Sequence, residues 1–135
     1  MAFFSTKLVT TFDAFEALRE SWNELVGNME RPEVFYLWEW NFHYFRHCRE
    51  GDRLLIVVVT HSSGRLAAIA PLCVRDVRRF GWPARVVNTI VTEIGDYGNI
   101  LVHGAYHRGR IVSAVFGCLR EQSHLWDVID VSQLC

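Results

Sequence analysis

Side chains that could bind a ligand concentrate in two segments of this sequence. In the first, seven of the 18 aromatic residues fall between Phe35 and Phe45. Such a cluster is able to form a stacking wall for a flat, sugar-like or acyl ligand. The alternative is a helix packed on a sheet, with surplus rings at a subunit interface. The helical spacing of Trp38, Phe42 and Phe45 favours this second interpretation.

The second segment is the polar turn Gly95-Asp96-Tyr97-Gly98-Asn99. Asp, Gly and Asn favour turn conformations for local reasons, but Tyr97 is not needed for turning. The segment therefore either orients a polar ligand or only reverses the chain. Some side chains in these two segments are not required for folding. If the protein has a pocket, we expect four of them to border it: Trp40, Tyr44, Asp96 and Tyr97.

Two histidine pairs have the spacing of one helical turn, His43 with His47 and His103 with His107. Such a pair binds a metal only with a third or fourth ligand. The sequence contains no HExxH motif. Surface histidines are therefore the favoured interpretation, and no metal site is predicted. No Ser-His-Asp or Cys-His arrangement carries a local signature. We therefore assign no catalytic nucleophile.

A local basic patch with two aromatic residues interleaved consists of Arg75, Arg78, Arg79, Phe80, Trp82 and Arg85. It could contact phosphate, or stack on RNA bases. The formal net charge of the chain is only −1, so no global field attracts nucleic acid or an anionic membrane. A solvated loop is the favoured interpretation, and nucleic acid is an unlikely partner.

The 135 residues suit a single domain over residues 1–135. The four cysteines lie far apart, which excludes a zinc-knuckle or redox pair, and a reducing cytoplasm is the expected location. The longest apolar stretch, residues 54–59, is too short to span a bilayer, so no membrane contact is expected.

Apolar periodicity predicts the elements of the N-terminal half. A strand is expected over residues 3–10, and a helix follows whose inward face is Phe12, Phe15, Leu18, Trp22 and Leu25. Thr10 fits the start of this helix because it lies three residues before Asp13, and Gly27-Asn28 fits its end. A second helix is expected over residues 37–48.

Residues 54–60 form a continuous run rich in β-branched side chains, which predicts a strand buried on both faces. A tight turn over residues 61–64 leads into a strand over residues 65–74, in which Pro71 implies a bulge or an edge position. A basic loop is expected over residues 75–83, and strands over residues 86–91, 100–102 and 126–131. A third helix is expected over residues 107–122, with an inward face of Ile111, Val115, Cys118 and Leu119. This order predicts an α+β fold with a mixed, largely antiparallel sheet and about three packed helices.

Five phrases of the sequence, in this order and spacing, resemble the N-terminal half of the GNAT-like acyltransferases of the CelD (cellulose biosynthesis) type, which are related to FemAB-like proteins. The phrases are Phe15-x-x-Leu18-x-x-x-Trp22-x-x-Leu25, Val34-Phe35 leading to Trp38-Glu39-Trp40, Gly64-Arg65-Leu66-Ala67-Ala68-Ile69-Ala70-Pro71-Leu72, Gly95-Asp96-Tyr97-Gly98-Asn99-Ile100-Leu101 and Trp126-Asp127-Val128-Ile129-Asp130-Val131. The resemblance covers nearly the whole chain and implies a GNAT-like half.

Members of that family carry two GNAT-like halves and hold the acyl-CoA phosphate on backbone N–H groups in a glycine-containing turn, Q/R-x-x-G-x-G/A, at a helix start. This sequence has no such turn, and its nearest glycine cluster, residues 95–98, places an acid where the phosphate would sit. The resemblance therefore implies the fold without the activity, with the catalytic half absent. The expected function is a non-catalytic binding or assembly domain without a cofactor. The alternative is a component of a split acyl-CoA-dependent N-acyltransferase, which would use acetyl-CoA and need a separate catalytic half.

The expected partner is a second copy of the chain, as a two-fold homodimer, with another protein partner as the alternative. In the longer relatives, a second half should cover the apolar surface near the strand of residues 126–131. Without that half, self-association would cover the surface, and closed two-fold symmetry is the commonest outcome. The surplus aromatic residues 35–45 are the second candidate surface.

The missing phosphate-binding turn leads to the first prediction. The chain alone should show no saturable binding of CoA in the micromolar range by titration calorimetry and no acetyl-CoA-dependent transfer. Micromolar binding of CoA would contradict it.

Overall fold

The computed structural model of the protein describes residues 4–32, 34–48, 51–91 and 100–129. Its helices and strands form an α+β fold, as predicted. In chain order they are β1 (Phe4–Val9), α1 (Phe12–Ala17), α2 (Arg19–Gly27), the 3-10 helix η1 (Val34–Tyr36), α3 (Trp38–Cys48), β2 (Arg53–Leu54), β3 (Ile56–His61), β4 (Leu66–Ala70), β5 (Leu72–Arg79), β6 (Trp82–Thr89), β7 (Leu101–Val102), α4 (Arg108–Glu121), the 3-10 helix η2 (Ser123–Leu125) and β8 (Val128–Ile129).

The strands form two sheets of four strands each. The first has the order β1-β3-β4-β7 and is antiparallel throughout, and the second has the order β2-β5-β6-β8. In the second sheet β6 and β8 are parallel, while the other pairs are antiparallel. The expectation of mixed and largely antiparallel pairing is therefore confirmed, although the strands are divided between two sheets where one was expected.

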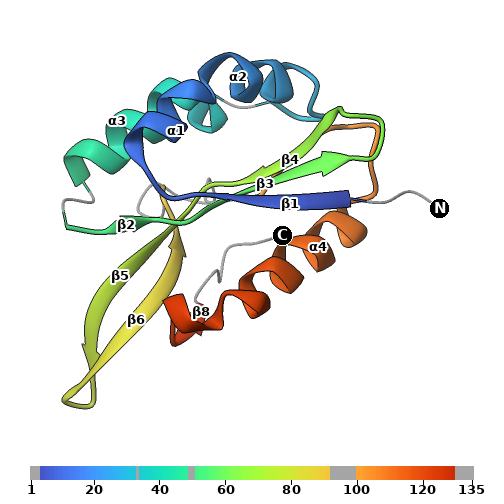
Figure 1. The fold of residues 1–135 in the computed structure, drawn as a ribbon. Helices are drawn as coiled ribbons and strands as arrows, with labels where there is room; N and C mark the ends of the chain where they lie inside the picture. Colours follow the sequence, from blue (N-terminus) through green and yellow to red (C-terminus); the bar gives the residue numbers. More distant parts are fainter. Residues whose placement is uncertain (1–3, 33, 49–50, 92–99, 130–135) are drawn as a thin grey trace.

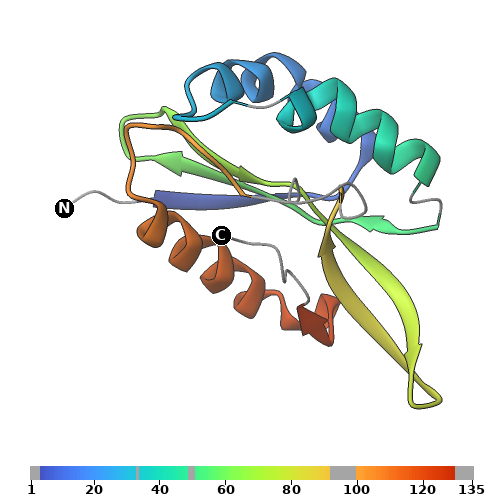
Figure 2. The same cartoon turned by 180° about the vertical axis from the view of Figure 1, so that it is seen from behind.

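Helices cover the first sheet on both faces. Figures 1 and 2 show α1, α2 and α3 along one face and α4 along the other, whereas the hairpin of β5 and β6 extends away from these layers. We call this hairpin, residues 72–89, the arm. The strand predicted over residues 54–60 is divided at Leu55 into β2 and β3, which belong to different sheets. The side chains of residues 54–59 are all buried, as predicted, whereas Thr60 is half-buried, and the buried side chains alternate between the two cores. Leu54, Ile56 and Val58 pack under α1–α3, and the residues between them pack over α4.

The first predicted helix is two helices, because the chain bends at Leu18. The N-cap is Thr11, whose hydroxyl accepts the Ala14 N–H at 3.2 Å, so the predicted start at Thr10 is wrong by one residue. The predicted end is confirmed, since α2 finishes at Gly27 with Asn28 as its C-cap. Of the predicted inward face, the buried side chains are Phe15, Trp22 and Leu25.

Helix α3 buries one side, as its spacing predicts. Trp38, Phe42 and Phe45 are buried, and the rings of Trp38 and Phe42 stack at 4.5 Å between centroids. The Trp38 indole N–H donates to the Phe15 carbonyl at 2.8 Å. These contacts explain three of the seven clustered aromatic residues by folding alone.

The predicted course of residues 65–83 needs two corrections. Pro71 lies between β4 and β5, at the point where the chain passes from the first sheet to the second, and not within one bulged strand. Residues 75–83 are not a loop, because β5 and β6 pair in register from Leu72 with Thr89 to Arg79 with Trp82. The bulge in this region lies between β3 and β4, where the register shifts between Val59 and Thr60.

The C-terminal elements follow the prediction closely. The inward face of α4 is buried and consists of Ile111, Val115, Cys118 and Leu119. The predicted final strand is present as β8, which is shorter than the predicted range, and residues 130 and 131 lie outside the described residues. In the part of the chain that the structure describes, no helix has the length and apolar character needed to cross a membrane.

The packing of Phe15 leads to a stability prediction. This fully buried ring lies within 6 Å of the rings of Trp22, Trp38 and Phe42, so Phe15→Ala should lower the free energy of unfolding by about 3–5 kcal/mol. The control Phe12→Ala removes a ring that remains 46% exposed and should cost about 1 kcal/mol. Urea denaturation measures both, and equal losses would contradict this account of the core.

Candidate functional site

The outward side of α3 forms a shallow apolar hollow of about 420 Å³, which we call the α3 hollow. It is lined by Glu39, Trp40, His43 and Tyr44, which recur one turn apart. The opposite side of the helix is occupied by the core residues, so this second set of rings faces outward. Trp40 and Tyr44 are half-buried and pack against the core under α1–α3, so the α3 hollow is a partly exposed apolar surface at the edge of that core.

Two of the four predicted pocket residues, Trp40 and Tyr44, line the α3 hollow together. The Trp40 ring packs edge-on against Phe35 at 4.7 Å between centroids, and its buried indole N–H has no hydrogen-bond partner among the described residues. The other two, Asp96 and Tyr97, lie outside the described residues, so the four-residue pocket stays a prediction.

The rim of the α3 hollow is held by a polar network between α2 and α3. The Glu39 carboxylate accepts hydrogen bonds from Asn23 at 2.8 Å and from Arg19 at 3.0 Å, and Asn23 in turn accepts the Trp38 N–H at 2.9 Å. The bond from Asn23 is the largest cause that holds the pKa of Glu39 below its ordinary value. The rim therefore keeps a negative charge in a fixed position.

Two further hollows meet at His103, which directly follows β7. One, of about 640 Å³, has Glu24 and Arg65 among its lining, and the other, of about 240 Å³, has Tyr36 and Tyr106. Both are lined mainly by residues from loops and helix ends, and their charges have both signs. No local sequence pattern predicts this groove, because its residues are far apart in the chain.

The ring of His103 is held as a neutral tautomer. Its Nδ1 accepts the Ala105 N–H at 3.0 Å, so the proton of the neutral ring is on Nε2. Burial lowers the pKa of His103, and the positive charge of Arg65 lowers it further. His103 and His107 are not a helical pair, since the first follows a strand and the second caps α4. No group of three potential metal ligands occurs among the described residues.

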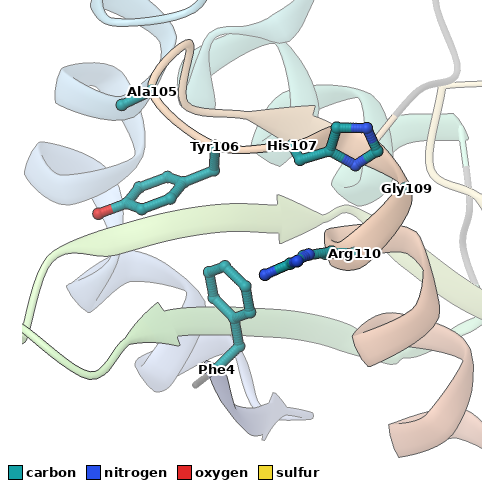
Figure 3. A pocket seen from close by; sticks show the side chains of 6 residues that line it. All are labelled: Phe4, Ala105, Tyr106, His107, Gly109 and Arg110. Carbon is teal, nitrogen blue, oxygen red and sulfur yellow. The ribbon is translucent and has the colours of Figure 1, made fainter. Parts of the chain in front are cut away.

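A fourth hollow, of about 510 Å³, lies at the start of α4 next to the His103 groove. Figure 3 shows Arg110 extending toward the ring of Phe4, while the His107 ring points away from it. Phe4 also packs edge-on against Tyr106 at 5.7 Å between centroids. The hollow is open and its aromatic lining is engaged in ring contacts, so it has the features of a packed surface more than of a catalytic centre.

The tip of the arm exposes two large aromatic side chains. Phe80 is 100% exposed and Trp82 is 75% exposed. Phe80 and Gly81 are the two central residues of the turn and have φ of 53° and 81°, and positive φ at both positions is what a type I′ hairpin turn requires. Sequence reasoning noticed these rings but placed them in a solvated loop.

Two of the four arginines predicted as a phosphate-binding patch pair with acidic residues. Arg85 binds Asp127 at 3.1 Å, and Arg75 lies 3.6 Å from Asp52. The hydrogen bond to Asp127 is the largest cause that raises the pKa of Arg85. Arg78 instead donates to the Gly81 carbonyl at 3.4 Å, beside the tip. The charges of Arg75 and Arg85 are therefore neutralised along the arm, and Arg78 is a positive charge near the exposed rings.

The neutral state of His103 leads to a pH prediction. Its imidazole should titrate with a midpoint below the ordinary value of about 6.5, measured by NMR. As the pH falls, the imidazole of His103 is protonated in the unfolded chain before it is protonated in the folded one. The contribution of His103 to stability is therefore complete above pH ~6.5 and is lost as the pH falls through the lowered pKa of the folded state. Arg65→Gln should raise the midpoint only part of the way, since burial is the larger cause. A midpoint at or above the ordinary value would contradict the described geometry.

No model of a known protein family matches this sequence, and no curated protein matches it. The resemblance to GNAT-like acyltransferases therefore stays a prediction from the residues quoted for it, and the function is best argued from the protein's own surface.

Proposed function

We propose that the protein is a non-catalytic binding and assembly domain that associates with a second copy of itself through the tip of the arm. The observation that carries this proposal is the state of Phe80, which is fully exposed and has a positive φ. Folding favours neither property in a phenylalanine, and both occur at the same residue.

The backbone of Phe80 is costly for this residue type. A residue with a Cβ atom in the left-handed region is disfavoured by roughly 1–2 kcal/mol, and Gly, Asn or Asp is the usual choice at this position of the turn. The ring does not offset this cost within its own chain, because it is fully exposed. Residues that break a local rule in this way concentrate at functional sites.

The composition of the tip suits a protein partner. Aromatic residues and arginine are enriched at the energetic centres of protein interfaces, and the tip combines Phe80 and Trp82 with Arg78. The pairing of Arg75 and Arg85 with acidic residues makes two of the four arginines of the predicted patch less available to a polyanion. A protein surface is thus favoured over nucleic acid, and we take the two-fold dimer as the form of assembly because it is the commonest closed form.

We also propose the cytoplasm as the location of this assembly. Cys73 and Cys118 are buried in the two cores. Thiols that pack as small apolar side chains are typical of proteins in a reducing compartment.

The test is a double substitution that removes the rings without harming the turn or the strand. Phe80→Asn suits positive φ and Trp82→Thr suits a strand, so the variant should melt no lower than the wild type. In a sedimentation dilution series the wild type should be dimeric at high micromolar concentration, and the variant should remain a monomer of 15.7 kDa.

The control is Val34→Thr, which removes another exposed apolar side chain, 58% exposed, away from the arm. It should dimerise as the wild type does. A monomeric wild type at every concentration, or a double variant that dimerises normally, would overturn the proposed function.

A further inference from the structure

We infer that the hollow between α2 and the turn of β3 and β4 binds a small zwitterion, a ligand of the amino-acid or short-peptide type with a carboxylate and an ammonium group. This hollow, of about 640 Å³, is the part of the His103 groove that has Glu24 and Arg65 in its lining, and we call it the α2 hollow. The inference goes beyond the proposed function and does not rest on it, because every residue of the lining belongs to one copy of the chain.

One side of the α2 hollow offers hydrogen-bond acceptors. Ser21, Glu24 and Asn28 recur at steps of three and four residues, so they lie along one side of α2 and its C-cap. The Asn28 side chain donates to the Glu24 carbonyl at 2.9 Å, which leaves its side-chain oxygen as an acceptor. The Glu24 carboxylate makes no ion pair among the described residues. This side is therefore suited to an ammonium group.

The other side offers donors from segments of the first sheet. Arg65 follows the tight turn between β3 and β4 and closes it by accepting the His61 N–H on its carbonyl at 2.9 Å. In the part of the chain that the structure describes, the Arg65 guanidinium has no acidic partner. The His103 ring uses Nδ1 to accept the Ala105 N–H, so its Nε2 carries the remaining donor. A carboxylate can accept from both side chains.

Backbone hydrogen bonds hold the two sides together without a ligand. The His103 N–H donates to the Ala67 carbonyl, and the Gly104 N–H donates to the Asn28 carbonyl, both at 2.9 Å. A Cβ atom at Gly104 would lie 3.2 Å from that Asn28 oxygen, so glycine permits this close approach between the segment after β7 and the end of α2. A site whose backbone is already fixed loses little freedom when a ligand binds.

The two opposite charges favour a zwitterion over a simple anion or cation. An anion bound at Arg65 would share the α2 hollow with the Glu24 carboxylate, and a cation bound at Glu24 would share it with the guanidinium. A ligand with both charges satisfies both groups. Because burial lowers the pKa of His103, its neutral ring adds a hydrogen bond without a second positive charge. The volume lies within the ~300–1,000 Å³ that is usual for small-molecule sites.

The first test is a titration with glycylglycine at pH 7, followed through the NMR signals of the His103 ring. A saturable shift with a dissociation constant on the order of 1 mM or tighter is expected for a ligand of so few atoms. N-acetylglycine lacks the ammonium group and glycinamide lacks the carboxylate, so each should bind at least about tenfold more weakly. Glycine and triglycine carry the same two charges at a shorter and a longer separation, and their affinities identify the length that the site fits.

The second test removes the two charges of the site one at a time. Arg65→Gln and Glu24→Gln should each weaken the binding of glycylglycine at least about fivefold, as the loss of a charged hydrogen bond does. The matched controls are Arg46→Gln on α3 and Glu20→Gln one turn earlier on α2, which lie outside the lining. They should change the dissociation constant by less than about twofold. All four side chains are exposed, so the variants should fold as the wild type does.

The outcomes separate this inference from the proposed function. Figures 1 and 2 show the turn between β3 and β4 and the segment before α4 at the end of the molecule away from the arm. The arm variant Phe80→Asn/Trp82→Thr should therefore bind glycylglycine as the wild type does, whether or not the wild type dimerises. Equal affinity for N-acetylglycine and glycylglycine would identify a site for anions alone. That result, or the absence of a saturable shift with all three zwitterions, would overturn the inference and leave the role of the arm unaffected.

Discussion

The change of strand partners at Pro71 is the constraint on which the rest of this structure depends. β4 ends at Ala70 and belongs to the first sheet, whereas β5 begins at Leu72 and belongs to the second. Proline has no N–H to donate, so the ladder opens there, while its carbonyl accepts the Ile90 N–H at 2.8 Å. The chain passes between the two sheets in the same way at Leu55, which lies between β2 of the second sheet and β3 of the first. The Leu55 N–H donates to the Leu72 carbonyl at 3.0 Å. Two sheets thus arise from one long hairpin.

This division leaves the far end of the second sheet outside the two cores, although its first residues, such as Leu72 and Cys73, belong to them. The first sheet is covered on both faces by helices, and its apolar side chains are used in the two cores. The second sheet continues past these helices as the arm (Figure 2), and the rings of Phe80 and Trp82 at its tip are exposed. The segment between β7 and α4, orange in Figure 1, lies at the end of the molecule away from the arm. The groove at His103, the first residue of that segment, has a polar, mixed-charge lining. Assembly through the arm therefore leaves that groove open, and the proposed split acyltransferase component rests on the sequence resemblance alone.

Sequence reasoning succeeded where burial alone decides the pattern. The inward sides of α3 and α4, the buried run of residues 54–59 and the α+β class all follow from apolar periodicity, and the structure confirms them. It failed along the arm, because Pro83 and Gly81 resemble loop punctuation. Pro83 is tolerated because it lies near the tip, beyond the short stretch of β6 that pairs with β8. The hairpin turn between β5 and β6 was not predicted, because Phe80 occupies the position at which glycine or asparagine usually indicates such a turn.

The candidate sites were predictable to different degrees, for a physical reason. Trp40 and Tyr44 lie on one helix, so their spacing brings them together without knowledge of the fold. The groove at His103 joins α2, η1 and the loop after β7, and only the tertiary arrangement makes these segments neighbours. The bend at Leu18 likewise depends on packing that no local pattern describes.

The most direct measurement of the central claim places a single fluorine probe at the tip. With 4-fluorophenylalanine at residue 80 alone, the ¹⁹F resonance reports whether this ring is in water or in an interface. The account predicts a resonance that moves or splits between dilute and concentrated protein, toward the environment of a buried ring, as the dimer forms. A resonance that keeps the water-exposed position while the protein dimerises would show that the arm is not the contact and would contradict the account.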